Sequence, residues 1–470
     1  MRVGVVIDRL DGERAARAAY VVRTLLVTLG LRPEEVSPRA GSLAGRVVVW
    51  YGRAAADVDA AARVEIPCAE PLTPQEAIDA YRVLTGEEAA VAPEGQDPAR
   101  VRVGADLVGA AGLWLTGGEE RDSGRDAFGR VPGAASPRHQ AGLLRTPVVH
   151  DLMHVLWAAL RRASEAAGLE LTRAPAWPEG RRFAVLLSHD VDLWRKRTAR
   201  QLLKAFARSP WRPGAIARTF CCGPDPWSDL GGIAALEEQR GMGSTFFILA
   251  GRPGRTVEGV RVVNGYDAPR DEVAATAHGL TERGAEVALH GSSDSFCSSE
   301  ALTAERRDVE ALAATHVAGC RQHFLRFERP DTWRAQAAAG LGYDASLGYH
   351  DTDGHRAGFA FPFLPFDGEE LPLLELPLTV MDGALLERQG LDADAAWERL
   401  EAHLERTEAD GAMLGLLWHN THFCELDAPG YRGVYERALD WIRDHNGWGA
   451  SARDIAAWWT RRSAELTQLD

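Results

Sequence analysis

Hydrophobic residues occur in short runs that alternate with longer amphipathic stretches along most of the chain. Short continuous apolar runs are typical of buried strands, and apolar positions three and four apart indicate helices. In the first third of the chain the strand-like runs are 2–7 and 47–51, and the helix-like stretches are 13–29, 74–85 and 149–167. This alternation predicts an α/β layer domain.

The segment TRAPAWPEGRR, residues 172–182, interrupts this pattern with two prolines and a glycine. Because such a stretch breaks regular structure, we predict a linker there. The chain is thereby divided into an N-terminal α/β domain over residues 1–171 and a second domain over residues 183–470. A chain that starts near Ala174 is expected to fold by itself. Residues 86–140 give no clear pattern.

After the linker, strand-like and helix-like stretches alternate regularly. The predicted strands are 183–189, 244–250, 285–290, 321–327, 373–380 and 411–418. The predicted helices are 195–207, 229–240, 271–283, 303–317, 330–339, 392–407 and 431–445. About seven such units predict a distorted (β/α)7-type barrel, with an open doubly wound sheet as the alternative.

Polar residues that bind metals or transfer protons follow four of the predicted strands. They are Asp190 and Asp192, His290 and Asp294, Arg321 and His323, and His419. The carboxyl ends of parallel strands meet on one face, so we expect these side chains to lie together. Strand alternation places His189 on the opposite side, where it would pack. The alternative interpretation is structural: the aspartates could cap a helix, and His290 could be a hydrogen-bonded core residue.

At these residues the sequence resembles the polysaccharide deacetylases, also described as NodB-homology or carbohydrate esterase family 4 proteins. SHDVD, HGSSD, RQHF and LLWHN resemble the first, second, third and fifth motifs of that family, in the same order. The fourth motif, an Asp–Trp segment, has no clear match. The resemblance covers about residues 183–446. Longer phrases such as WPEGRRFAVLLSHDVD and WHNTHF resemble a subgroup with an N-terminal α/β domain of unknown function.

The resemblance implies a divalent metal and hydrolysis of an N-acetyl group. In the implied catalytic set, Asp190 is the general base, His419 is the general acid and Arg321 orients Asp190. The implied metal ligands are Asp192, His290 and Asp294, with Ser292 and Ser295 as nearby alternatives, and the implied substrate-binding residues are His323, Phe324, Arg356 and Trp418. The sequence departs from the family where Asp294 replaces His or Ser, and where His323 and Phe324 replace Pro and Tyr.

The cofactor and substrate follow from the same resemblance. Zinc is the usual metal of the family, and Co, Mn, Fe or Ni would also suit carboxylate and imidazole ligands. The expected substrate is an N-acetylated sugar or a sugar-containing precursor. Two alternatives stay open: an amidohydrolase of the same fold that acts on a non-sugar amide or cyclic imide, and a catalytically inactive carbohydrate-binding scaffold.

Charge and composition narrow the class of protein further. The 470 residues carry 53 Lys and Arg against 67 Asp and Glu, a net charge of −14, which argues against a general role on nucleic acid or anionic membrane. No apolar run is long enough for a membrane span, and MRVGVVIDRL is expected to form a strand rather than a secretory leader. The six cysteines form no CxxC pair, which favours buried thiols in a cytoplasmic protein.

Overall fold

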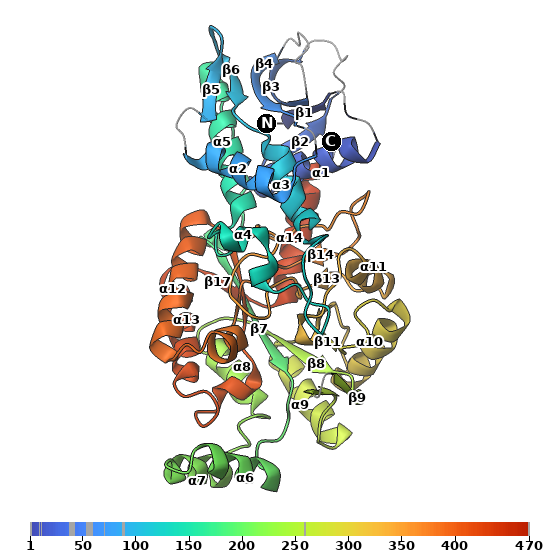
Figure 1. Cartoon of the computed structure of the whole chain (residues 1–470), viewed down its shortest axis with the longest axis vertical. Coiled ribbons are helices and arrows are strands. Elements are labelled where there is room, and N and C mark those ends of the chain that lie inside the picture. The colour runs from blue at the N-terminus through green and yellow to red at the C-terminus, as the bar shows by residue number, and fades with distance from the viewer. Residues whose placement is uncertain are drawn as a thin grey trace.

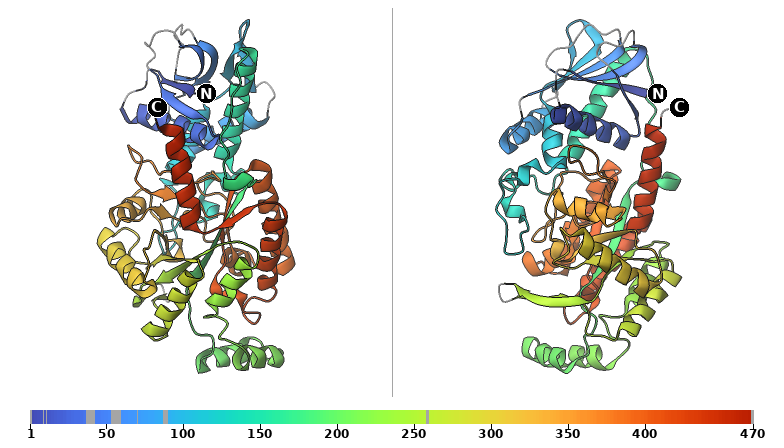
Figure 2. Two further views of the ribbon diagram at one scale, coloured as in Figure 1. Left: turned by 180° about the vertical axis from the view of Figure 1, so that it is seen from behind. Right: turned by 90° about the vertical axis from the view of Figure 1, so that its right-hand side faces the viewer.

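The computed structural model describes residues 2–8, 10, 12–36, 43–52, 60–69, 71–86, 90–257 and 260–468. An N-terminal sheet with its helices lies at one end of the molecule, and a larger, mostly parallel sheet fills the other (Figure 1). The views from behind and from the side show the same two parts, and the C-terminal helix runs from the larger part towards the N-terminal sheet (Figure 2). The division at residues 172–182 stays a prediction.

The N-terminal sheet has the strand order β2-β1-β3-β4-β6-β5. Its strands are β1 (Arg2–Ile7), β2 (Arg32–Glu35), β3 (Leu43–Gly52), β4 (Ala60–Pro67), β5 (Val91–Glu94) and β6 (Asp97–Val103). All neighbours are parallel except β5 and β6. The helices of this half are α1 (Gly12–Thr28), α2 (Pro74–Gly86), α3 (Leu107–Leu115), α4 (Pro137–Gln140) and α5 (Val148–Ala166). Alternation works as expected here, since Val3 and Val5 join the main core while Val6 packs on the opposite face with Trp50.

The second sheet has the order β14-β13-β12-β11-β8-β7-β16-β15, and β17 also pairs with β7. The strands are β7 (Ala184–Val191), β8 (Thr245–Leu249), β11 (Glu286–Gly291), β12 (Gly319–Gln322), β13 (Tyr343–Asp344), β14 (Leu374–Glu375), β15 (Val380–Met381), β16 (Met413–Leu417) and β17 (Trp448–Ala450). Every pair in it is parallel. This half-barrel confirms the predicted distorted barrel, and a separate antiparallel pair, β9 (Arg252–Val257) and β10 (Val260–Asn264), lies beside it.

Helices connect these strands near the predicted places. They are α6 (Ala199–Arg208), α7 (Pro213–Cys221), α8 (Leu230–Glu238), α9 (Arg270–Glu282), α10 (Ser299–Ala313), α11 (Asp331–Ala338), α12 (Ala393–Asp410), α13 (Tyr431–Asp444) and α14 (Ala452–Thr467). Several begin where the sequence offers a capping side chain: Thr198, Ser298 and Asp392 accept hydrogen bonds from the first turns of α6, α10 and α12. Among the described residues, none of the helices combines the length and the apolar character needed to cross a bilayer.

The two halves are joined by α14 and by the segment that follows α3. Arg462 on α14 donates hydrogen bonds to the carbonyl groups of Val27 and Thr28 at the end of α1, and to that of Pro175. Free carbonyl groups at a helix end are a favourable place for a cation. Buried residues of both sheets form one continuous cluster, in which the Trp177 ring stacks on that of Phe361.

Candidate metal centre and active site

The predicted site residues gather at the carboxyl ends of β7, β11, β12 and β16. These strands are neighbours on the path β12-β11-β8-β7-β16, so their ends open on one side of the sheet. A pocket of about 220 Å³ lies there. Its walls include Asp190, Asp192, His290, His323 and His419. The expectation that these side chains share one face is therefore met.

Asp192, His290 and His323 form the candidate metal site. His290 Nε2 lies 3.1 Å and His323 Nε2 3.4 Å from Asp192 Oδ1. One ligand atom from each of the three residues falls within 4.8 Å of the other two. Both imidazoles are buried, and the Asp192 side chain is 31% exposed, which leaves the site open to the pocket. One carboxylate and two imidazoles with an open side are a donor set typical of catalytic zinc.

The protonation of these residues fits a bound cation. His290 Nδ1 lies 2.9 Å from the carbonyl oxygen of Arg321; a carbonyl only accepts, so Nδ1 carries a proton and Nε2 is the nitrogen on the side of Asp192 that could bind a metal. Burial lowers the pKa of His323 to about 4, which keeps this imidazole neutral, as a metal ligand must be. Burial also lowers the pKa of His290, but Asp190 and Asp192 raise it more, so this part of the pocket attracts positive charge.

The structure corrects the predicted third ligand. Asp294 lies in the turn after β11 with its side chain 46% exposed, and its Oδ1 is 3.7 Å from Arg326 rather than in the pocket. The spacing of four residues from His290 would bring both side chains together on a helix, but the chain does not form a helix there. Ser292 and Ser295 are not ligands either, because their hydroxyls bond to Glu305 and to a backbone carbonyl. His323, predicted to bind substrate, lies instead beside Asp192 and His290, where a third ligand atom could be supplied.

Asp190 and Arg321 form a buried ion pair beside the metal site. Arg321 NH1 donates to Asp190 Oδ1 at 3.0 Å and to the Ser188 hydroxyl at 2.8 Å, and its Nε donates to the carbonyl of Ala345. The guanidinium also lies over the Phe247 ring, 4.4 Å from its centroid. With these contacts Arg321 restrains the orientation of the Asp190 carboxylate. The other Asp190 oxygen lies 3.8 Å from His290 Nε2, so it faces the metal site.

His419 approaches the metal site from the other wall of the pocket, and Asp382 positions it. His419 Nδ1 lies 2.6 Å from Asp382 Oδ1, and His422 Nδ1 lies 2.7 Å from Asp382 Oδ2. Burial lowers the pKa of His419, but the Asp382 carboxylate raises it more, to about 10; the same carboxylate raises that of His422 to about 9. His419 Nε2 then lies 3.7 Å from Asp192 Oδ2. The pocket therefore holds a protonated imidazole that points toward the metal ligands.

Sequence reasoning missed Asp382, although a signal was present. The residue follows the short strand β15 in the phrase LTVMDGAL, as His419 follows β16, while Asp190 lies at the carboxyl end of β7. It is fully buried and accepts the backbone N–H of His419 and of Gly383 in addition to both imidazoles. A lone carboxylate at the end of a buried strand is costly without such partners. An aspartate at the end of an apolar strand therefore predicts polar partners nearby, and this argument would have identified Asp382.

A second missed contribution comes from the segment before the predicted linker. Arg130 lines the pocket, donates from NH1 to the Phe324 carbonyl at 3.0 Å and is held by Asp126. The Phe128 ring stacks on that of Phe324 with centroids 5.2 Å apart. Phe324 also lines the pocket, in agreement with the sequence, and has a φ of +62°, a region that non-glycine residues rarely adopt. One wall of the site therefore belongs to residues 126–130, part of a segment with no clear hydrophobic pattern.

Two residues predicted to bind substrate lie elsewhere. Arg356 is buried and forms a two-pronged ion pair with Glu120, away from the pocket. Trp418 is fully buried, and its ring packs against Tyr431 and Tyr435. The prediction that Arg356 and Trp418 bind substrate is therefore wrong. A charged or aromatic residue near a motif suggests a binding group, but here tertiary packing covers both side chains.

His189 behaves as predicted. Its side chain points away from the pocket, with Nε2 2.8 Å from Glu237 Oε1 and Nδ1 2.7 Å from the carbonyl of Trp418.

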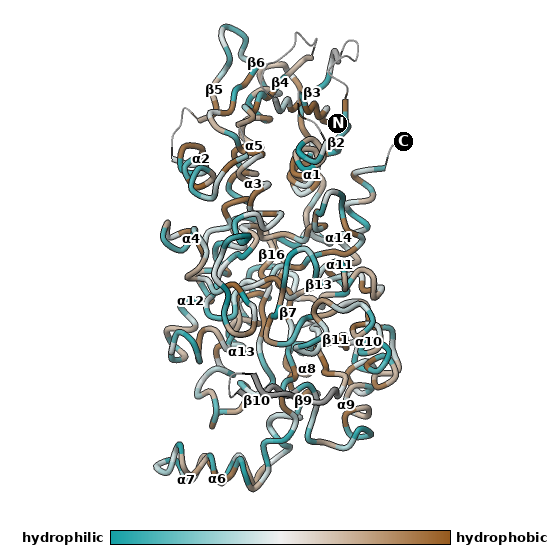
Figure 3. The backbone as a smooth tube through the Cα atoms, turned by 45° about the vertical axis from the view of Figure 1, so that its right-hand side comes forward, coloured by the Kyte–Doolittle hydropathy of each residue, from teal (hydrophilic) through white to brown (hydrophobic). Residues whose placement is uncertain are grey.

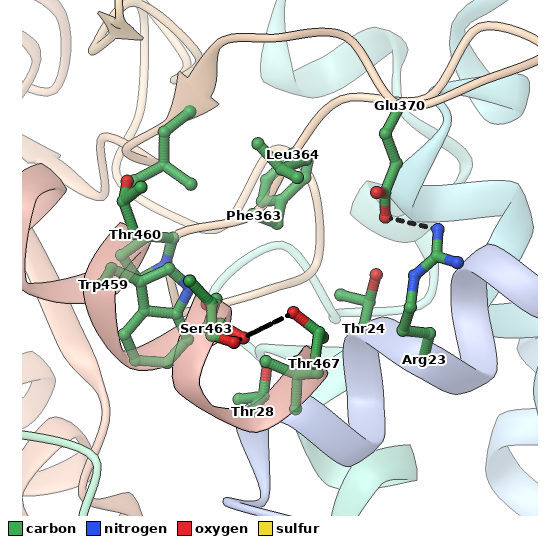
Figure 4. A pocket seen from close by; sticks show the side chains of 14 residues that line it. Arg23, Thr24, Thr28, Phe363, Leu364, Glu370, Trp459, Thr460, Ser463 and Thr467 are labelled. Atoms are coloured by element: carbon green, nitrogen blue, oxygen red, sulfur yellow. Dashed lines mark hydrogen bonds and ion pairs between the residues drawn. The ribbon is translucent and has the colours of Figure 1, made fainter. Parts of the chain in front are cut away.

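A separate cavity of about 230 Å³ lies between α1, α14 and the loop around Leu364 (Figure 4). It is lined by threonines and apolar side chains, with an Arg23–Glu370 ion pair of 2.8 Å at one side. It shares no residue with the pocket that contains Asp192.

Comparison with protein-family models finds no match, and comparison with curated proteins finds no significant one. Solved structures similar to this chain are polysaccharide deacetylases. A protein from Mycobacterium smegmatis assigned as one is 19% identical with a TM-score of 0.43, and the match covers 64% of this chain and 99% of that one. The peptidoglycan deacetylase PdaC from Bacillus subtilis is 12% identical with a TM-score of 0.31, covering 61% of this chain and 95% of that one.

BA3943 from Bacillus anthracis, a CE4 family pseudoenzyme, is also similar. It is 11% identical, with a TM-score of 0.31, and the match covers 61% of this chain and 70% of that one. These three matches cover between 61% and 64% of this chain.

Proposed function

We propose that this protein is a metal-dependent hydrolytic deacetylase that removes an N-acetyl group from a sugar or a sugar-containing substrate. One observation carries the proposal: a carboxylate base, a carboxylate and two imidazoles for a metal, and a protonated imidazole line one pocket. Each of these parts would assist hydrolysis of an amide, because water is a weak nucleophile and an amine leaves poorly as an anion.

Asp192, His290 and His323 would hold the ion, and zinc suits this donor set best. When bound, the ion would polarise the amide carbonyl and assist attack by water. Asp190, fixed by Arg321, would accept the proton of the attacking water. His419 would donate its Nε2 proton to the amide nitrogen as the C–N bond breaks, giving acetate and an amine.

The pocket limits what can enter. Its volume of about 220 Å³ suits one sugar ring or the end of a chain rather than a buried oligosaccharide. Arg130 and Phe324 form one wall, and Met381 and Arg388 lie on another. We place the reaction in the cytoplasm, a proposal supported by six cysteines that are all unpaired, although only Cys320 and Cys424 are buried and the expectation of buried thiols is wrong for the others.

Metal analysis and product assays of the purified protein test the proposal. We expect about one equivalent of a divalent metal per chain and release of acetate from an N-acetylated amino sugar. Asp190→Asn should retain the metal and lose activity, because an amide cannot accept the proton. Asp382→Asn should also retain the metal and lower kcat by about 10²-fold or more, because His419 loses the partner that keeps it protonated.

Other results would contradict parts of the proposal. A metal-loaded protein that hydrolyses a cyclic imide but no N-acetylated sugar would favour the amidohydrolase alternative. A protein that binds no metal and retains affinity for sugars would favour the inactive scaffold. Asp190→Asn with activity near that of the unchanged protein would remove Asp190 from the role of base.

A further inference from the structure

Helices α6 and α7 form a hairpin that projects from the molecule. It follows β7 directly and lies at the end of the molecule opposite the N-terminal sheet, as all three ribbon views show (Figures 1 and 2). The hairpin has its own small core: Ala205 and Ile216 are buried against Trp227 and Leu426. Its inner face is thus satisfied, and its outer face is available for another partner.

The hairpin is strongly basic in an acidic protein. Residues 193–224 contain eight Lys and Arg and no Asp or Glu, whereas the whole chain has a net charge of −14. Arg195 and Lys196 pair with Glu272 and Asp427 elsewhere in the chain. In the described part of the chain no ion pair is found for four further cations: Arg200, Lys204, Arg208 and Arg218. Half of the eight positive charges of the hairpin are therefore exposed without a carboxylate partner among the described residues.

The same hairpin exposes large apolar side chains. Leu203 is 72%, Phe206 49% and Trp211 74% exposed, the three highest values among the large hydrophobic residues described. Leu203 and Phe206 are three residues apart on α6, so they lie on one face, and Trp211 follows in the turn to α7. Coloured by hydropathy, both helices show hydrophilic and hydrophobic positions in alternation (Figure 3). Exposed aromatic and aliphatic residues among free cations are not expected on a surface that only meets water.

We propose that the α6–α7 hairpin binds the surface of a bilayer that contains anionic lipids. Uncompensated cations would approach the lipid phosphates, while Leu203, Phe206 and Trp211 would enter the region between headgroups and acyl chains. A nucleic acid would use the cations but gain little from an exposed leucine and phenylalanine on one helix face. Charge complementarity and apolar exposure together favour the bilayer.

The position of the hairpin relates binding to the proposed reaction. A groove of about 580 Å³ lies between α6 and the active site, and Lys204 and Arg208 line it. The groove shares Leu193, Glu387, Thr421 and His422 with the pocket that contains Asp192. If the proposed deacetylase function holds, a docked protein would receive a substrate at the membrane surface, such as a sugar on a lipid phosphate. The lipid binding itself does not depend on that function.

Co-sedimentation of the full-length protein with vesicles tests the proposal. Vesicles of phosphatidylglycerol mixed with phosphatidylcholine should bind the protein, and pure phosphatidylcholine vesicles should bind it much less. Replacing three free cations together, Arg200→Gln, Lys204→Gln and Arg208→Gln, should weaken binding about a hundredfold, since each cation near an anionic surface contributes about fivefold. The apolar variant, Leu203→Ser with Phe206→Ser and Trp211→Ser, should weaken it by about tenfold or more.

Matched variants elsewhere provide the controls. Arg161→Gln, Arg334→Gln and Arg432→Gln remove three exposed cations outside the hairpin and should leave binding unchanged. Val83→Ser removes another exposed apolar residue and should also have no effect. The proposal is wrong if neither vesicle binds the unchanged protein, if the hairpin variants bind as the controls do, or if the cation variant loses affinity for duplex DNA while vesicles never bound. Vesicle binding needs no turnover, so an inactive protein would leave this result interpretable.

Discussion

The proposed metal site depends most on His323. Asp192 and His290 alone would give two protein ligands, and His323 would supply the third. Its Nε2 lies 3.4 Å from Asp192 Oδ1. It reaches the site because β12 ends at Gln322 and the next residues form a tight turn with positive φ at Phe324 and Leu325. The local backbone thus places an imidazole where the related motif has a proline.

Replacing His323 and Asp294 separately tests this assignment. His323→Ala should lower metal affinity by on the order of 100-fold or more, because it removes a direct ligand, and losses of 10–100-fold are found even for groups one step removed. Asp294→Ala should leave the affinity unchanged, because that side chain is half exposed and faces Arg326. Competition with a chelating dye measures both constants. The opposite result, loss in Asp294→Ala alone, would restore Asp294 as the ligand.

At the scale of elements, the segment between α3 and α5 fixes the shape of the active-site wall. Glu120, just after α3, accepts hydrogen bonds from Arg356 and lies 3.3 Å from Arg329, so three buried charges tie this segment to the second sheet. Burial raises the pKa of Glu120, but Arg329 and Arg356 lower it more, to about 2. The ionised form of Glu120 therefore stabilises the folded state relative to the unfolded chain.

The stability of the protein should respond to pH through Glu120. Its pKa is lower in the folded state than in the unfolded chain, so its contribution is complete above about pH 4.5 and is lost as the pH falls toward about 2. Glu120→Gln should lower the free energy of unfolding by about 3 kcal/mol at neutral pH, and this difference should shrink toward pH 2. Thermal unfolding followed by circular dichroism at several pH values measures it.

The exposed pair Arg161–Glu165 provides the control for this experiment. Glu165→Gln should change the free energy of unfolding by less than about 0.5 kcal/mol at any pH, because exposed ion pairs contribute little. A constant difference between Glu120→Gln and the unchanged protein from neutral pH to pH 2 would show that Glu120 does not supply this dependence.

At the scale of the whole molecule, the two halves depend on each other more than the linker suggests. Arg462 on α14 caps α1 from the far half, and Arg130 reaches the active-site pocket from the near half. Arg329 and Arg356 are buried and have Glu120 as their carboxylate partner. Leaving buried charges without a partner costs about 3–5 kcal/mol, a large part of the usual stability of a domain.

We therefore now expect that a chain starting near Ala174 does not fold stably, which reverses the expectation from the sequence. A chain starting near Gly118 retains Glu120 and Arg130, and it should unfold at a higher temperature and remain more soluble than the shorter one. Size-exclusion chromatography and thermal unfolding compare the two. Equal stability of both fragments would show that the segment 118–173 is not needed for the second sheet to fold.

The sequence by itself determined the order of elements and most of the site. Apolar runs ending in Asp190, Asp192, His290 and His419 predict parallel strands whose ends share one face, and this holds because strand periodicity and chain order are local properties. The same local signals place seven helices of the second half within a few residues, whereas α7 and α14 were not predicted. Asp392, for example, lies at a predicted helix start and acts as a cap, while Thr198 caps α6 three residues after the predicted start.

Tertiary structure decided what depends on distant pairing. His323 rather than Asp294 joins the metal site because the turn after β11 points outward while the end of β12 points inward, and spacing along the chain does not carry that direction. Asp382 becomes the partner of His419 through the pairing of β15 with β16. Arg130 lines the pocket and bonds to the carbonyl of Phe324, which is 194 residues further along the chain. Each of these contacts depends on pairing or packing between segments far apart in the chain, which local hydrophobic patterning does not encode.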